Sequence, residues 1–83
     1  MTLDILYFAW LRERIGLPRE TVQTSASTVR ELVAELAARD DWHKAAFADL
    51  SAVRCAVDQQ LAELDASLDG AREVAFFPPM TGG

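Results

Sequence analysis

The sequence predicts an α+β fold in which a small mixed sheet is covered on one face by one main helix. Runs that alternate apolar and polar residues occur near both ends of the 83-residue chain, which is typical of strands with one buried face. Between them, one segment carries its apolar residues on a single helical stripe, so it can cover only one side of a sheet. A chain of this length forms a single domain with a small core.

The first strand is predicted over residues 2–8, where apolar residues occupy alternate positions. Its odd-numbered side chains are expected in the core, because Asp4 requires water on the other face. Leu6 and Phe8 then form an apolar pair on the face that no helix covers.

A short helix over residues 9–15 should follow and end at Gly16, the residue type that most often terminates a helix. Residues 19–24 are predicted as a second strand. We expect it at the edge of the sheet, because Val22 is its one clearly apolar residue.

The main helix is predicted to begin after Thr28, which forms a capping box with Glu31. Apolar residues then recur at helical spacing: Val29, Leu32, Val33, Leu36 and Ala37. A second short helix is expected over residues 42–50, where Trp42 is among the residues that should close the core.

Three further strands are predicted in the last third of the chain. They cover residues 53–57, a short return at 61–62, and residues 73–77 after an Asp-Gly turn. In the last strand Phe76 should point into the core and Phe77 away from it. We expect this strand to lie beside the first one.

The open face of the sheet should then carry an apolar patch made of Leu6, Phe8, Leu61 and Phe77. Such a patch on a small domain usually indicates a partner-binding site. The alternative is that these are scattered surface residues, or that the helix over residues 9–15 covers them.

Charge and cysteine content restrict the class of partner. The chain has 13 acidic and 8 basic residues and a net charge of −5, which argues against nucleic acid and against anionic membranes. It has one cysteine, no secretory signal and no apolar run of membrane-spanning length. We therefore expect a cytoplasmic protein with protein partners, no nucleic acid and no membrane.

No pattern of catalytic residues is present. His43 is the single histidine, and we interpret it as a solvated or packing residue. Cys55 alternates with two valines on a strand face that should be buried, where a thiol has a raised pKa and is inert; a persulfide carrier is the alternative. These two residues are too few for a zinc site. We expect no metal, and no enzyme activity of the chain on its own.

The C-terminal segment, unlike the rest of the chain, is predicted to be an extended tail with a reactive group at its end. We divide the chain into a domain over residues 1–77 and an extended tail over residues 78–83, which begins with two prolines and ends in Gly82 and Gly83. Six residues reach roughly 20 Å, and two terminal glycines can enter a channel that any Cβ would block. The carboxylate is then the one reactive group that the tail can deliver. An ordinary frayed terminus is the alternative.

The ending FFPPMTGG, residues 76–83, resembles that of the small subunits of molybdopterin synthase. The resemblance extends over nearly the whole chain, including LYFA at residues 6–9 and AVDQ at residues 56–59. Two departures are Met80, where Val is common, and Asp58, where Asn is more usual.

This resemblance implies a β-grasp, ubiquitin-like fold and the role of a sulfur carrier. In that family an E1-like partner uses ATP to adenylate the C-terminal carboxylate, here that of Gly83, and sulfur replaces AMP to give a thiocarboxylate. The large synthase subunit then receives the tail, and sulfur passes to cyclic pyranopterin monophosphate to build the dithiolene of molybdopterin. Two large and two small subunits assemble, and the carrier itself binds no cofactor.

The resemblance also implies roles for individual residues. Gly83 would carry the transferred group, with Gly82 before it. Partner-binding roles are implied for Phe8, Arg12, Leu61, Phe77, Pro78, Pro79, Met80 and Thr81. A β-grasp sulfur carrier for thiamine or cysteine biosynthesis, or a ubiquitin-like interaction module with an inert tail, are the alternatives.

Overall fold

The computed structural model describes residues 1–79. Its strands are β1 (Thr2–Tyr7), β2 (Arg19–Gln23), β3 (Arg54–Val57), β4 (Gln60–Ala62) and β5 (Glu73–Phe77). Its helices are α1 (Ala9–Ile15), α2 (Val29–Ala37) and α3 (Asp41–Ala46), with a 3-10 turn η1 (Leu50–Ala52). None of the helices described here is long and apolar enough to cross a membrane.

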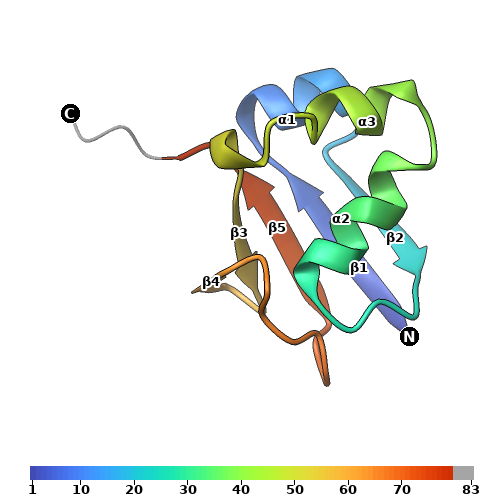
Figure 1. Ribbon diagram of the computed structural model, residues 1–83, viewed down its shortest axis with the longest axis vertical. Coiled ribbons are helices and arrows are strands. Elements are labelled where there is room, and N and C mark those ends of the chain that lie inside the picture. The colour runs from blue at the N-terminus through green and yellow to red at the C-terminus, as the bar shows by residue number, and fades with distance from the viewer. Residues whose placement is uncertain (80–83) are drawn as a thin grey trace.

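The five strands form one mixed sheet in the order β2-β1-β5-β3-β4. The last strand, β5, runs parallel to the first, β1, and the other neighbouring pairs are antiparallel. Figure 1 shows β1 and β5 in the middle of the sheet, with α2 lying across it. This arrangement confirms the predicted α+β class, the β-grasp fold and the edge position of β2.

The core lies between the sheet and the helices, and the predicted faces are confirmed. The inward side chains of β1 and β5 are fully buried: Leu3, Ile5, Tyr7, Val74 and Phe76. Phe76 stacks on Tyr7 with ring centroids 6.2 Å apart and meets Phe47 edge-on at 5.0 Å. The aromatic residues of β1 and β5 therefore pack against one another inside the core.

The ends of two helices follow the predicted local rules. Thr28 Oγ1 accepts a hydrogen bond from the Glu31 N–H at 3.2 Å, and Glu31 Oε2 accepts one from the Thr28 N–H at 3.1 Å, so α2 begins with a capping box. Helix α1 ends at Gly16, whose φ of 88° is the left-handed conformation that glycine adopts most easily.

The predicted second short helix is confirmed, but it ends at Ala46 rather than at residue 50, and the prediction that Trp42 lies in the core is wrong. The Asp40 side chain accepts a hydrogen bond from the His43 N–H, so α3 begins at Asp41 and ends at Ala46. With that start, His43 and Ala46 form the buried stripe, and Trp42 is 68% exposed. The predicted first strand is also one residue too long, since Phe8 is the N-terminal cap of α1.

Candidate functional site

The sheet face opposite the helices carries a row of apolar side chains that crosses four strands. Leu6 of β1 pairs with Ala75 of β5. Ala75 also pairs with Ala56 of β3, and Ala56 pairs with Leu61 of β4. Because paired residues of neighbouring strands point to the same face, these four side chains form one row. Leu61, at the edge, is 81% exposed.

A second row lies beside the first one, at the end of the sheet where β5 finishes. Phe77 pairs with Arg54 of β3. The Phe8 N–H donates to the Phe76 carbonyl at 3.0 Å, which continues the β1–β5 pairing by one residue and sets Phe8 beside Phe77. Phe8 is 45% exposed and Phe77 is partly exposed.

The four residues of the predicted patch thus occupy two adjacent rows of one face. We name the set Leu6, Phe8, Ala56, Leu61, Ala75 and Phe77 the open-face patch. Sequence reasoning missed Ala56 and Ala75 as members and did not connect Arg54 with this end of the sheet. These assignments depend on which strands are neighbours, and strand order carries no local sequence signal.

The structure follows the chain two residues beyond β5. Pro78 and Pro79 come directly after Phe77 and are partly buried. Arg12 is on the exposed side of α1, one helical turn after Phe8. The predictions for Met80, Thr81, Gly82 and Gly83 lie outside the described residues.

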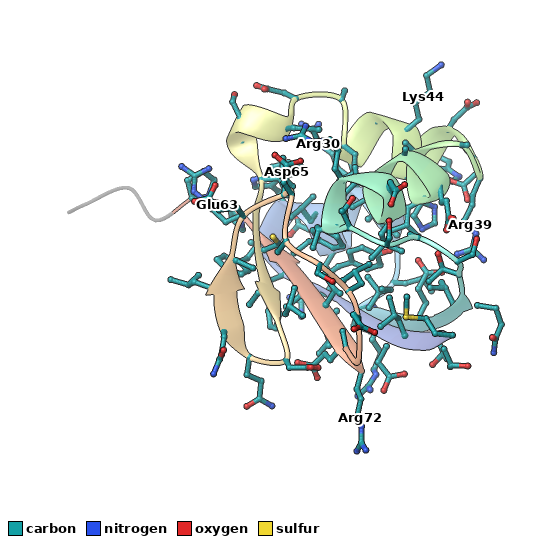
Figure 2. All side chains as sticks on the ribbon, turned by 60° about the horizontal axis from the view of Figure 1, so that its bottom comes forward. Arg30, Arg39, Lys44, Glu63, Asp65 and Arg72 are labelled. Atoms are coloured by element: carbon teal, nitrogen blue, oxygen red, sulfur yellow. The ribbon has the colours of Figure 1, made fainter. Side chains whose placement is uncertain are left out.

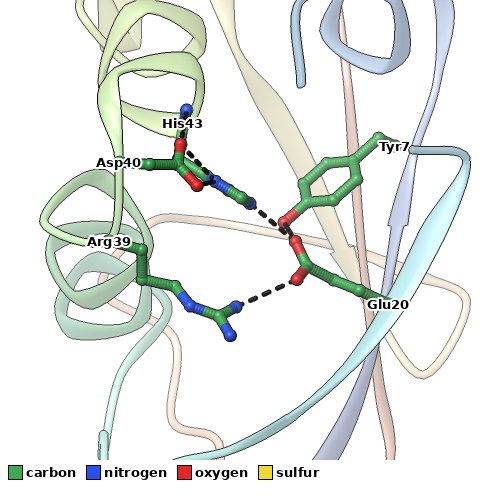
Figure 3. A network of polar contacts seen from close by, with 5 residues as sticks. All are labelled: Tyr7, Glu20, Arg39, Asp40 and His43. Atoms are coloured by element: carbon green, nitrogen blue, oxygen red, sulfur yellow. Dashed lines mark hydrogen bonds and ion pairs between the residues drawn. The ribbon is translucent and has the colours of Figure 1, made fainter. Parts of the chain in front are cut away.

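A second group of polar residues lies at the other edge of the sheet, between β1, β2 and the start of α3 (Figure 3). Glu20 Oε2 lies 2.7 Å from the Tyr7 hydroxyl and 2.7 Å from His43 Nε2. His43 Nδ1 lies 2.9 Å from Asp40 Oδ1, and Arg39 donates to Glu20 Oε1 at 2.9 Å. Since both ring nitrogens face carboxylate oxygens, only the imidazolium form donates to both.

The pKa values in this group follow from burial and hydrogen bonding. Burial alone would lower the pKa of His43, but its hydrogen bonds to Glu20 and Asp40 outweigh burial and raise it. Burial would raise the pKa of Glu20, but the hydrogen bonds from His43 and Tyr7 lower it. Burial, followed by the hydrogen bond to Glu20, raises the pKa of Tyr7.

Each member of the group is engaged by another, so the group braces the fold rather than offering a free acid or base. His43 is 5% exposed, which confirms the packing interpretation and excludes the solvated one. Sequence reasoning missed the group, because Glu20 and His43 are 23 residues apart along the chain.

Cys55 is buried, and its thiol donates to the Ala62 carbonyl at 3.2 Å. Burial, with a smaller effect of the Glu63 charge, raises the pKa of the thiol. An enclosed neutral thiol is a poor nucleophile, as predicted for a core residue. Within residues 1–79, no group of three or more His, Cys, Asp or Glu side chains is arranged so that it could hold a metal ion.

Comparison with known proteins gives consistent matches over the full length. A family model described as the ThiS family matches residues 5–83. The molybdopterin synthase sulfur carrier subunit of Escherichia coli (strain K12) is 38% identical over 81 residues, which cover 98% of this chain and 99% of that protein. The subunit of the same name from Haemophilus influenzae is 33% identical, with the same coverage.

Two solved structures share the fold. SAMP1 from Haloferax volcanii has a TM-score of 0.75 at 22% identity and covers 100% of both chains. A putative molybdopterin converting factor, subunit 1, from Pyrococcus furiosus has a TM-score of 0.74 at 24% identity, over 96% of this chain and 99% of that one. Together with the two curated relatives, the family match leads to one conclusion: the chain belongs to the ThiS family.

Proposed function

We propose that this protein is the sulfur-carrier subunit of a molybdopterin synthase and works with a large subunit that holds the catalytic residues. The observation that carries the proposal is the 38% identity, over 98% of the chain, to a protein of that name. The structure supports it in two ways. The strand that leads into the C-terminal tail ends beside the open-face patch, and the polar groups of the His43 cluster are already engaged.

The proposed cargo is sulfur on the C-terminal carboxylate of Gly83. A carboxylate is a poor electrophile, so an E1-like partner first joins it to AMP: a carboxylate oxygen attacks the α-phosphorus of ATP, and pyrophosphate leaves. Sulfide then attacks the acyl carbon, AMP leaves, and the proton of the sulfide goes to water. The product is a thiocarboxylate, whose sulfur is the nucleophile in the next step.

The thiocarboxylate would act inside the large subunit. The open-face patch docks there, and the tail beyond Phe77 carries the sulfur to cyclic pyranopterin monophosphate. Holding the sulfur next to the substrate makes transfer effectively intramolecular. Two transfers supply the two sulfurs of the dithiolene, in an assembly of two large and two small subunits.

Two measurements test this function. Incubation with the E1-like partner, ATP and sulfide should raise the intact mass by the difference between sulfur and oxygen, and a variant lacking Gly83 should show no thiocarboxylate. The loaded carrier, mixed with the large subunit and cyclic pyranopterin monophosphate, should then yield molybdopterin. Loading without molybdopterin would point to a sulfur carrier of another pathway. Absence of loading would point to an inert interaction module.

A further inference from the structure

The open-face patch is bordered by different charges at its two ends. Beyond the apolar row, on the side away from the tail, Asp4 of β1 pairs with Glu73 of β5, so two carboxylates lie next to each other on this face. At the opposite end, Arg54 lies beside Phe77. One end of the face therefore carries Glu73 and an Asp4 that is ion-paired with Arg19, and the end from which the tail departs carries Arg54.

Arg54 has a free guanidinium among the residues that the structure describes. It is exposed, and within residues 1–79 its side chain makes no ion pair or hydrogen bond. Three other arginines each pair with a carboxylate: Arg19 with Asp4, Arg30 with Asp65 (Figure 2) and Arg39 with Glu20. Arg12, Arg72 and Lys44 also make no side-chain ion pair within residues 1–79, but Arg54 differs from them because it pairs with Phe77 in the sheet, where the tail departs.

We propose that Arg54 orients this protein on its partner by pairing with a carboxylate at the rim of the channel that receives the tail. The partner is the large subunit of the synthase, so the inference rests on the proposed function. A guanidinium pairs with a carboxylate through two parallel hydrogen bonds, which fixes direction as well as position.

Orientation matters here because the apolar row alone does not define it. The row of Leu6, Ala75, Ala56 and Leu61 runs across the strands, and apolar contact is non-directional. A partner turned end for end would bring its rim carboxylate against Glu73, beside an Asp4 that is already paired with Arg19, and like charges in contact disfavour that arrangement. Arg54 thus distinguishes the arrangement that sends the tail into the channel from the reversed one.

The test is a charge reversal with a matched control. Arg54→Glu and Lys44→Glu change the net charge equally, but Lys44 lies on α3, in the helical layer and away from the end of β5 (Figure 2). Binding of each variant to the large subunit is measured by titration calorimetry and by stopped-flow association, at low and at high salt. Thermal melts verify that both variants fold.

We expect Arg54→Glu to weaken binding about tenfold at low salt, mainly through slower association, with a smaller loss at high salt. Arg54→Gln should fall between wild type and Arg54→Glu, and Lys44→Glu should change binding less than twofold. Equal effects of the two charge reversals would overturn the role of Arg54 while leaving the proposed function in place. Absence of binding by the wild-type protein would overturn the proposed function, and this inference with it.

Discussion

Replacing His43 with glutamine should lower the stability of the fold in a way that depends on pH. The His43 side chain is 7% exposed and that of its partner Glu20 is 13% exposed, so the ion pair between them lies largely out of water. His43→Gln removes one of the two cations that pair with Glu20, while Arg39 stays 2.9 Å from Glu20 Oε1, so we expect the free energy of unfolding to fall by about 2 kcal/mol. For a domain of this size, that lowers the midpoint of thermal unfolding by roughly 8–16 °C.

The direction of the pH dependence follows from the two pKa shifts. The pKa of His43 is raised, so its contribution is fully present below its unfolded value of about 6.5 and is lost as pH rises through the folded pKa. The pKa of Glu20 is lowered, so its contribution is present above about 4.3 and is lost as pH falls through the folded value. The stabilising effect of the pair should therefore be greatest between these two limits.

Urea unfolding of wild type and His43→Gln at intervals from pH 5 to pH 9 measures this effect. The gap in unfolding free energy should be widest below pH 6.5 and should narrow as pH rises, by at most about 1.4 kcal/mol per pH unit. Since His43 is the single histidine, its NMR signal reports its pKa directly. A pH-independent gap, or a measured pKa at or below 6.5, would refute the argument.

Four other substitutions test the two faces of β5, the role of the thiol and the cap of α2. Phe76→Ala should lower the free energy of unfolding by roughly 3–5 kcal/mol in a urea or thermal melt, because the ring is fully buried. Phe77→Ala should mainly weaken binding to the large subunit. The opposite pattern would mean that the assigned faces of β5 are inverted. Cys55→Ser should leave sulfur loading and transfer near normal, and loss of both in a folded variant would instead place the sulfur on the thiol. Thr28→Ala should lower the free energy of unfolding by about 1 kcal/mol, because the N-terminal cap of α2 is lost. An unchanged unfolding midpoint would mean that the capping box does not stabilise the fold.

The sequence predicts those features of the fold that local rules control. The bounds of β5 are correct, because an Asp-Gly turn precedes the strand and two prolines follow it. The outward direction of Phe77 follows from simple alternation along that strand.

Other features depend on contacts between distant segments. Trp42 is apolar, and the sequence therefore predicts it in the core, but His43 takes the inward position because its ring contacts Glu20 of β2 and lies edge-on to Tyr7 of β1. The position of Arg54 beside Phe77 likewise depends on β3 being a neighbour of β5. Neither the polar partners of a buried histidine nor the order of strands is contained in a local pattern of residues.

The place of β5 has a consequence for incomplete chains. This strand comes last among the elements, yet it lies between β1 and β3 and joins two antiparallel hairpins into one sheet. A chain that stops before Glu73, as in premature termination of translation, keeps both hairpins but lacks the strand that connects them, and isolated hairpins are marginally stable at best. The strand that leads into the C-terminal tail thus also completes the sheet, and we expect chains truncated before it to be unfolded and open to proteolysis.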